Sequence, residues 1–402
     1  MNRIVIVGAS AGGLATAEAL RRFGYEGAIT VLGDEPLLPY DRPPLSKQIL
    51  TGEWQPDRLP LRGKDDIDAL KLDLRPGTRA TGLDVAARTV TLADGSRSAY
   101  DGLVVATGVR PRRLPGPEGV AGVHTLRTLD DALTLKARLL AGRRLVIVGA
   151  GFIGAEVAAV ARGLGVDVTV LETAPVPMAL AVGEHTGKWL ARSHDDHGVQ
   201  LRTEVSVAGV LAVGGEVTGV ALADGSVIPA DDVLIAIGSV PNTEWLESSG
   251  LTVDNGLVCD EFSAAAPGVY AVGDVARWHN PLFGTAMRIE HRTNAAEQGM
   301  AVARNLLAQE PGLRRPFAPV PYFWSDQYEM KIQAYGYLRG HDEAAVVEDD
   351  APNGRLLVAY RTGDRLAGVL GVGIPPRTLR SWRALIAAGS PWAKALDTVA
   401  AA

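Results

Sequence analysis

Ile4-Val5-Ile6-Val7-Gly8-Ala9-Ser10-Ala11-Gly12-Gly13 opens the chain, and Leu145-Val146-Ile147-Val148-Gly149-Ala150-Gly151-Phe152-Ile153-Gly154 repeats its pattern about 140 residues later. Each begins with a short β-branched apolar run, which predicts a buried parallel strand. In such a turn the first glycine permits the bend, the second lets the backbone approach a pyrophosphate, and the third lets helix and strand pack closely. The helix that follows directs its N-terminus at the phosphates. Two copies therefore predict two nucleotide sites in one chain.

The residues that follow each turn support this interpretation. Alanine-rich helices are predicted over residues 14–23 and 156–163, and a second strand follows each helix. Asp34 and Glu35 end the second strand of the first copy, and Glu172 ends that of the second. These carboxylates stand where an acid would bind a ribose diol.

Ser10 stands where the middle glycine of the first turn would be expected. A serine adds a small side chain and a hydroxyl, which alters the site in detail without abolishing it. One glycine turn alone could be a tight structural connection. Two copies with strand, helix and distal acid in the same order favour nucleotide binding.

Composition limits the classes of function. The chain has 402 residues, 47% of them apolar, and a formal net charge of −6, which suggests two to three domains and argues against a dedicated nucleic-acid binder. No apolar run reaches the roughly 20 residues that span a bilayer, and no signal peptide precedes the first strand, so a cytoplasmic protein is expected. Cys259 is the only cysteine. It excludes intramolecular disulfides and is expected to be a small core or surface residue on a strand. No metal site is expected.

Internal repeats predict the domain organisation. The strand and glycine at residues 104–108 recur at 233–238, and residues 270–274 supply a further strand and glycine that would complete the first module. The proline-rich stretch 110–119 predicts a crossover linker between domains. The predicted fold is α/β, with two doubly wound Rossmann-like nucleotide-binding domains and an α+β C-terminal domain. The predicted domains are 1–110 with 243–318, the inserted domain 111–242, and 319–402, where strands at 355–360 and 366–371 precede a helix at 376–388.

Several further motifs are more specific than either glycine turn. They are Asp41–Lys47, Ala106–Gly108, Leu126–Thr128, the second fingerprint with Glu156, Tyr270–Asp274, Asn294-Ala295 and Tyr322–Gln327. With them the chain resembles, over essentially its whole length, the FAD-dependent NAD(P)H:ferredoxin reductases that serve cytochrome P450s and ring-hydroxylating dioxygenases. The resemblance implies a glutathione-reductase-like fold and an NADH:ferredoxin oxidoreductase that passes electrons through FAD to a [2Fe-2S] ferredoxin feeding an oxygenase.

The resemblance also divides the two turns between two cofactors. The first is expected to bind FAD and the second NAD. With the turn and acid residues above, the predicted FAD contacts are Gly8, Ser10, Ala11, Gly12, Gly13, Asp34, Glu35, Arg42, Lys47, Ala80, Ala106, Thr107, Gly108, Arg127, Gly273, Asp274, Arg292 and Trp324. The predicted NAD contacts are Gly149, Gly151, Phe152, Ile153, Gly154, Glu156, Glu172 and Gly238.

Lys47 and Glu156 are the predicted catalytic residues. In the family the lysine lies near the flavin, where its ammonium would favour the negative charge of the reduced form. Glu156 could pair with Lys47 and orient it. The alternatives are a solvated loop lysine and a carboxylate in the first turn of a helix, where the helix dipole favours it.

Four other side chains are expected to tune the site. Glu172 should bind both adenosine ribose hydroxyls and repel a 2′-phosphate, so NADH is preferred over NADPH. Phe152 is expected near the nicotinamide, as a gate or as a packing residue. Trp324 lies against the flavin or anchors the core. Many relatives have tryptophan at the position of Arg292, so the flavin environment or the partner surface differs here.

An acidic ferredoxin would need a local basic face. Candidate residues for this face are Arg314, Arg315, Arg377, Arg380 and Arg383. The alternative is that the arginines on the helix only form its solvated side, which is the more common role of such a cluster of charges. A rubredoxin partner, or an NADH-sensing flavoprotein of the apoptosis-inducing-factor type, remains an alternative. A flavin disulfide reductase or peroxidase-type NADH oxidase is disfavoured, because Cys259 lies far along the chain from the Asp41–Lys47 loop.

Overall fold

The computed structural model describes residues 1–115 and 119–400, which form two compact units. Unit 1 comprises residues 1–41, 59–110 and 240–322; unit 2 comprises residues 42–58, 111–239 and 323–402. Residues 116–118 of the expected linker lie outside the described residues. The strands β8 (Val109–Pro111) and β17 (Ser239–Pro241) fall where the chain passes from one unit to the other. The three-domain division itself stays a prediction.

Unit 1 is built on a six-stranded sheet of order β19-β20-β7-β1-β2-β3. Its strands are β1 (Arg3–Val7), β2 (Ala28–Leu32), β3 (Asp73–Arg75), β7 (Gly102–Val105), β19 (Ala264–Ala266) and β20 (Val269–Ala271). Only β19 runs antiparallel to its neighbour. The predicted strand at Tyr270 joins this sheet in parallel beside β7, more than 160 residues away in the chain.

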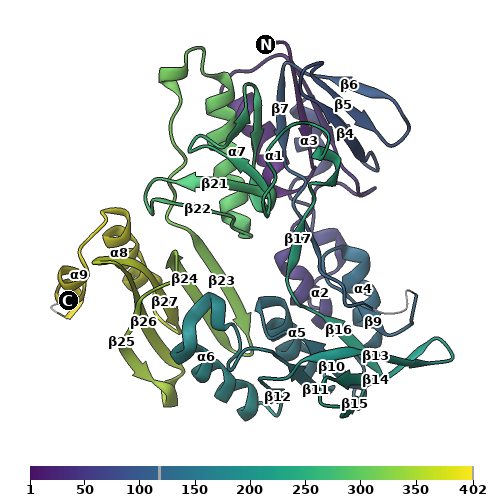
Figure 1. Ribbon diagram of the computed structural model, residues 1–402, viewed down its shortest axis with the longest axis vertical. Helices are drawn as coiled ribbons and strands as arrows, with labels where there is room; N and C mark the ends of the chain where they lie inside the picture. Colours follow the sequence, from purple (N-terminus) through teal and green to yellow (C-terminus); the bar gives the residue numbers. More distant parts are fainter. Residues whose placement is uncertain (116–118, 401–402) are drawn as a thin grey trace. The chain divides into compact units, whose positions relative to one another are not determined.

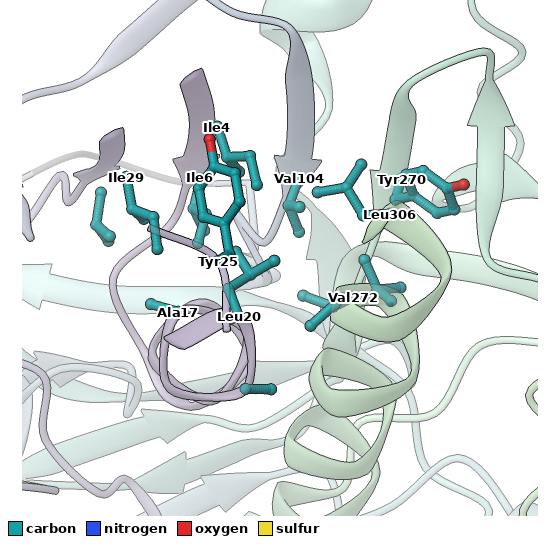
Figure 2. Packing of buried hydrophobic residues seen from close by; sticks show 14 residues of the cluster. Ile4, Ile6, Ala17, Leu20, Tyr25, Ile29, Val104, Tyr270, Val272 and Leu306 are labelled. Atoms are coloured by element: carbon teal, nitrogen blue, oxygen red, sulfur yellow. The ribbon is translucent and has the colours of Figure 1, made fainter. Parts of the chain in front are cut away.

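Two helices pack side by side in unit 1, α1 (Ala11–Arg22) and α7 (Arg292–Leu307). Figure 2 shows apolar side chains of the sheet, among them Ile6 and Val104, directed toward Leu20 of α1 and Leu306 of α7. Gly299 of α7 lets the helices approach, because a Cβ there would lie 2.8 Å from the carbonyl oxygen of Gly12. The sheet and the two helices thus pack through one apolar core, and Gly299 allows α1 and α7 to approach closely.

The remaining elements of unit 1 are smaller. They are the antiparallel sheet of β4 (Ala80–Asp84), β5 (Thr89–Leu92) and β6 (Arg97–Ala99), the sheet of β18 (Leu257–Cys259), β21 (Ala276–Asn280) and β22 (Thr285–Met287), the helix α3 (Lys64–Ala69), and the 3-10 turns η3 (Glu244–Leu246), η4 (Gly273–Val275) and η5 (Pro311–Leu313). Cys259 is buried on β18, and burial raises the pKa of its thiol far above the ordinary value. The prediction of a small strand residue is confirmed.

Unit 2 contains a five-stranded parallel sheet of order β12-β11-β10-β16-β9. Its strands are β9 (Val123–His124), β10 (Arg144–Val148), β11 (Asp167–Leu171), β12 (Gln200–Arg202) and β16 (Asp232–Ile235), and β13 (Val207–Val213), β14 (Glu216–Leu222) and β15 (Val227–Pro229) form a separate antiparallel sheet. Its helices are α2 (Gln48–Thr51), α4 (Leu129–Arg138), α5 (Phe152–Gly163) and α6 (Ala179–Asp196), with the 3-10 turns η1 (Pro43–Ser46) and η2 (Pro56–Arg58).

A second large sheet of unit 2 is antiparallel in its assigned pairings, with the order β23-β24-β27-β26-β25 (Figure 1). It contains β23 (Tyr322–Gln327), β24 (Met330–Gly336), β25 (Glu343–Asp350), β26 (Arg355–Thr362) and β27 (Arg365–Val372), followed by α8 (Pro376–Ala387) and α9 (Trp392–Ala400), with the 3-10 turn η6 (Ala351–Asn353) between β25 and β26. The predicted C-terminal strands and helix are confirmed. Val182 and Trp189 of α6 pack into the core of this sheet with Tyr360.

Within residues 1–115 and 119–400, no helix is long and apolar enough to cross a membrane. No group of three or more His, Cys, Asp or Glu side chains there is arranged to hold a metal ion.

His194 makes the stability of unit 2 depend on pH. His194 is a buried residue of α6, and its Nδ1 lies 2.7 Å from the hydroxyl of Tyr328. The ring of His197 stacks on the same tyrosine ring. Burial, with a smaller effect of His197, lowers the pKa of His194 to about 4. Because the unfolded chain binds the proton near pH 6.5, the free energy of unfolding should fall as pH drops from about 6.5 to about 4, by up to about 3 kcal/mol.

Urea denaturation between pH 7.5 and 4 tests this expectation. His194→Gln should flatten the loss of stability over that range. The control is His185→Gln on the same helix, where the side chain is 42% exposed, and it should keep the wild-type slope. Equal slopes in the wild type and His194→Gln would contradict the assignment.

Candidate functional site

The two glycine turns have the same backbone construction. Gly8 and Gly149 have φ of +117° and +100°, a region that residues with a side chain rarely adopt. A Cβ on Gly8 would overlap the carbonyl oxygen of Ala106, and one on Gly149 would crowd that of Ala236. At each turn the carbonyl at the end of the neighbouring strand, β7 or β16, therefore leaves no room for a side chain.

The third glycine of each turn is equally constrained. A Cβ on Gly13 would overlap the carbonyl oxygen of Gly8, and one on Gly154 that of Gly149. Each turn thus folds tightly onto its own helix. By contrast, nothing lies within 4 Å of a Cβ built on Gly151, so the middle position borders open space.

The helix starts beside these turns fit phosphate groups. Ser10 is the N-cap of α1 and Gly151 that of α5, and neither N-terminus has a side-chain cap or an acidic residue in its first turn. The amide groups there lack the partners that helix ends require, and the positive end of the dipole favours an anion. The residues present therefore fit a pyrophosphate at each turn.

The three acids behave differently. Glu172 accepts hydrogen bonds from the amides of Ala150 (2.7 Å) and Ala174 (2.8 Å), so its carboxylate lies at the second glycine turn. Glu35 accepts from the hydroxyl of Tyr40 at 2.5 Å. Asp34 forms an exposed ion pair with Arg79. Glu172 is therefore the acid that the hydrogen bonds place directly at a glycine turn, and the binding of ribose by these acids stays a prediction.

Other predicted FAD contacts of unit 1 gather at strand ends. Thr107 donates to the carbonyl of Asn242 at 2.8 Å, and its own carbonyl accepts from that side chain at 2.9 Å. Gly108 has a positive φ, and Ala80 begins β4.

Gly273 and Asp274 form η4, against which α7 begins. A Cβ on Gly273 would lie 3.2 Å from that of Ala295, and the same alanine borders Gly12 of α1. Gly12 and the neighbouring Ala11 therefore share one region of unit 1 with η4.

Arg292, the first residue of α7, forms an ion pair with Asp41 at 2.7 Å. Both side chains are about one-third exposed. The positive charge of Arg292 is thus offset by a carboxylate of its own chain.

Lys47 and Glu156 form a buried ion pair in unit 2. The ammonium lies 2.8 Å from Glu156 Oε2, and the side chains are 11% and 5% exposed. Ser46 donates to the same oxygen at 2.5 Å, and Ser325 of β23 donates to Oε1 at 2.8 Å. The alternative of a solvated lysine is wrong, because the Lys47 side chain is only 11% exposed. The alternative of a first-turn carboxylate is also wrong, because α5 begins at Phe152 and Glu156 is its fifth residue.

Six further predicted residues are placed within unit 2. Arg42 donates to the carbonyl of Arg127 at 2.6 Å. The ring of Phe152 packs edge-on against Phe323 at 4.9 Å, which confirms its packing role and leaves the gate a prediction. Trp324 alternates with buried Phe323 on β23 and is half-buried. Ile153 and Gly238 lie at the start of α5 and after β16, where Gly238 has a positive φ and its carbonyl accepts from Arg112 at 2.9 Å.

The predicted docking arginines lie on both units. Arg314 stacks over the ring of Phe262 at 4.9 Å and Arg315 is exposed. Arg377, Arg380 and Arg383 are exposed on α8, whose Leu379 and Trp382 are buried. Among the described residues, none of these three α8 arginines forms an ion pair, so their charge is available to solvent.

Comparison with known proteins identifies the family. Residues 2–299 match the pyridine nucleotide-disulphide oxidoreductase family, and residues 322–399 match the reductase C-terminal family. Rhodocoxin reductase of Rhodococcus erythropolis is 39% identical over 96% of this chain and 90% of its own length. Rubredoxin-NAD(+) reductase of Pseudomonas putida is 34% identical over 93% of this chain and 96% of its own length.

A solved structure agrees with these sequence matches. The structure described as the covalent putidaredoxin reductase-putidaredoxin complex is 35% identical, covers 100% of this chain and 98% of its own, and has a TM-score of 0.93. The chain belongs to the putidaredoxin reductase-like ferredoxin–NAD(+) reductases. The family consists of FAD-binding, NAD(+)-dependent oxidoreductases, and the predicted fold class is confirmed.

Sequence reasoning missed the residues that hold the ion pair. Ser46 and Ser325 lie inside motifs that were singled out, but serines have many structural uses and no spacing links them to Glu156, 110 and 169 residues away. The roles of the predicted contacts toward FAD and NAD stay predictions.

Coupling between Lys47 and Glu156 should be measurable in stability. Removing either partner leaves the other charge buried, so Lys47→Met and Glu156→Gln should each lower the free energy of unfolding by about 3–5 kcal/mol. The double variant should lose less than the sum, with a coupling energy above about 1 kcal/mol.

Urea denaturation of the four proteins measures this coupling. The exposed pair Arg79–Asp34 is the control, whose coupling energy should stay under about 1 kcal/mol. Additive losses at Lys47 and Glu156 would show that the two side chains do not depend on each other.

Proposed function

We propose that this chain is an NADH-dependent ferredoxin reductase, an FAD-dependent NADH:ferredoxin oxidoreductase. The observation that carries the proposal is the pair of turns with the same backbone construction, each with an uncapped helix start and a nearby acid in the sequence, in a chain of this family. Bound FAD would supply hydride acceptance from NADH and single-electron release to a [2Fe-2S] ferredoxin, which would feed a cytochrome P450 or ring-hydroxylating oxygenase.

The two turns take different cofactors in this proposal. The start of α1 and Glu35 hold the phosphates and ribose of FAD, together with the other predicted FAD contacts. The start of α5 and Glu172 hold NADH. A carboxylate binds both ribose hydroxyls and repels a 2′-phosphate, which supports the preference for NADH.

Lys47 serves the flavin as a fixed positive charge. Its ammonium offsets the negative charge that reduction adds, and Glu156 orients it. Ser46 and Ser325 are positioning residues, because they bond both carboxylate oxygens of Glu156 and so fix the direction from which Lys47 is held.

The electron acceptor is a small acidic protein. The unpaired charges of Arg377, Arg380 and Arg383 on α8 support this class of partner. A rubredoxin is the second candidate acceptor, since a rubredoxin-NAD(+) reductase is among the relatives. We place the reaction in the cytoplasm, where NADH is supplied.

Disulfide chemistry is not proposed, although the matching family is named for it. The chain has one cysteine, so it cannot form the dithiol pair that such a reaction uses. That cysteine is buried, and its raised pKa opposes the thiolate needed for attack.

Glu172 should set coenzyme preference. Glu172→Ala should reduce the ratio of kcat/KM for NADH to that for NADPH by about tenfold or more, because repulsion of the 2′-phosphate is lost. Steady-state ferricyanide reduction with each coenzyme measures it.

Glu35→Ala is the matched control at the first turn. It should loosen FAD while leaving the coenzyme ratio within about twofold. An unchanged ratio in Glu172→Ala would refute the assignment of Glu172 to the NADH ribose.

Reduction of cytochrome c by NADH, with and without a [2Fe-2S] ferredoxin or a rubredoxin, tests the function itself. Rapid reduction that depends on ferredoxin is expected. The double variant Arg380→Glu/Arg383→Glu should raise KM for ferredoxin about tenfold and leave ferricyanide reduction unchanged, since only the protein partner is steered by these charges.

Arg192→Glu, an exposed charge reversal on α6, is the control for net charge and should have little effect on KM for ferredoxin. Dependence on rubredoxin instead would assign the second candidate acceptor. Slow reduction with a long-lived reduced flavin complex would overturn the proposal in favour of an NADH sensor.

A further inference from the structure

Helix α7 carries three buried carboxamides. Asn294, Gln298 and Asn305 are 2%, 0% and 2% exposed. A side-chain amide offers two N–H donors and one oxygen acceptor, and burying them without partners is unfavourable. The three residues therefore show where α7 satisfies its polar groups and where it does not.

Two of the three are satisfied by the chain itself. Gln298 accepts from the amide of Gly273 at 2.9 Å and donates to the hydroxyl of Ser263 at 3.0 Å. Asn305 both donates to the carbonyl and accepts from the amide of Arg315, each at 2.9 Å. These two amides are parts of the internal framework of unit 1.

Asn294 differs from both. In the part of the chain that the structure describes, neither its Nδ2 nor its Oδ1 has a hydrogen-bond partner, although both atoms are buried. An amide kept in this state destabilises the chain by itself, so a partner from outside the chain is indicated.

The place of Asn294 indicates what that partner is. It is the third residue of α7, whose N-terminus has no side-chain cap and no acid in its first turn. The next residue, Ala295, borders Gly12 at the start of α1 and Gly273 of η4. Both neighbours belong to segments proposed to bind FAD, and Asn294 directly precedes the residue that borders them.

We propose that Asn294 is an FAD-binding residue whose buried carboxamide exchanges hydrogen bonds with the cofactor. The inference rests on the proposed function, because it takes FAD to be the occupant of the first site. In this arrangement the side chain of Asn294 forms hydrogen bonds with polar atoms of FAD, in addition to those formed by backbone groups of the glycine turn.

Apoprotein and holoprotein stability separate this role from a structural one. Asn294→Leu replaces an unsatisfied amide by an apolar side chain of similar size, so the apoprotein should melt no lower than wild type. The same change should weaken FAD binding about tenfold or more, measured by quenching of flavin fluorescence on titration into apoprotein. Loss of affinity without loss of apoprotein stability is the expected signature.

Asn305→Leu is the matched control on the same helix. It breaks bonds within the chain, so it should lower the melting temperature of the apoprotein and leave the dissociation constant of FAD within about twofold. Should Asn294→Leu fail to fold, Asn294→Ala is measured in its place against the same two quantities.

Two results would overturn the inference. One is an Asn294 variant that behaves like Asn305→Leu, with a less stable apoprotein and unchanged FAD affinity, as expected for an amide satisfied by internal water. The other is a variant that changes neither quantity. A wild-type chain that binds no FAD would instead overturn the proposed function, so the two failures are distinguishable.

Discussion

The close approach of backbone to backbone at Gly8 and Gly149 is the constraint on which the rest of the structure depends. At both turns a carbonyl of the neighbouring strand end occupies the space that a side chain would need. The same turn folds onto its helix through Gly13 or Gly154. Sheet, turn and helix are locked together, and the helix start is left without a cap. A nucleotide phosphate is the group that completes this arrangement.

The second organising feature is the carboxylate of Glu156, which joins parts of unit 2 that are distant in sequence. It is held by Ser46 and Lys47 from η1 and its end, and by Ser325 from β23. Four polar groups thus share one buried site, where each bond is stronger than in water but costly to leave unmade. The geometry explains how a charged lysine can be kept in a dry position without unfolding the unit.

Sequence reasoning predicted the regular elements well and the polar contacts poorly. The strands β1 and β10 each begin one residue before the predicted limit, because continuous β-branched runs leave little ambiguity. The helices α1 and α5 begin three and four residues earlier than predicted, at Ala11 and Phe152. Glycines inside the turns have low helix propensity and concealed these helix starts.

The polar contacts depend on tertiary packing, which no local pattern encodes. Arg292 reaches Asp41 across 251 residues, and Ser325 reaches Glu156 across 169. Motifs placed each of these residues in a segment of interest but could not pair them. The unsatisfied state of Asn294 is visible only once burial and every neighbouring donor and acceptor are known.

The central claim is that one turn, built twice, gives this chain two separate nucleotide sites with different cofactors. Anaerobic titration of the purified protein with NADH tests it most directly, with the flavin absorbance followed near 450 nm. The account predicts one FAD per chain, bleached completely by one equivalent of NADH. A chain that holds no flavin, or a bound flavin that NADH does not bleach, would contradict it.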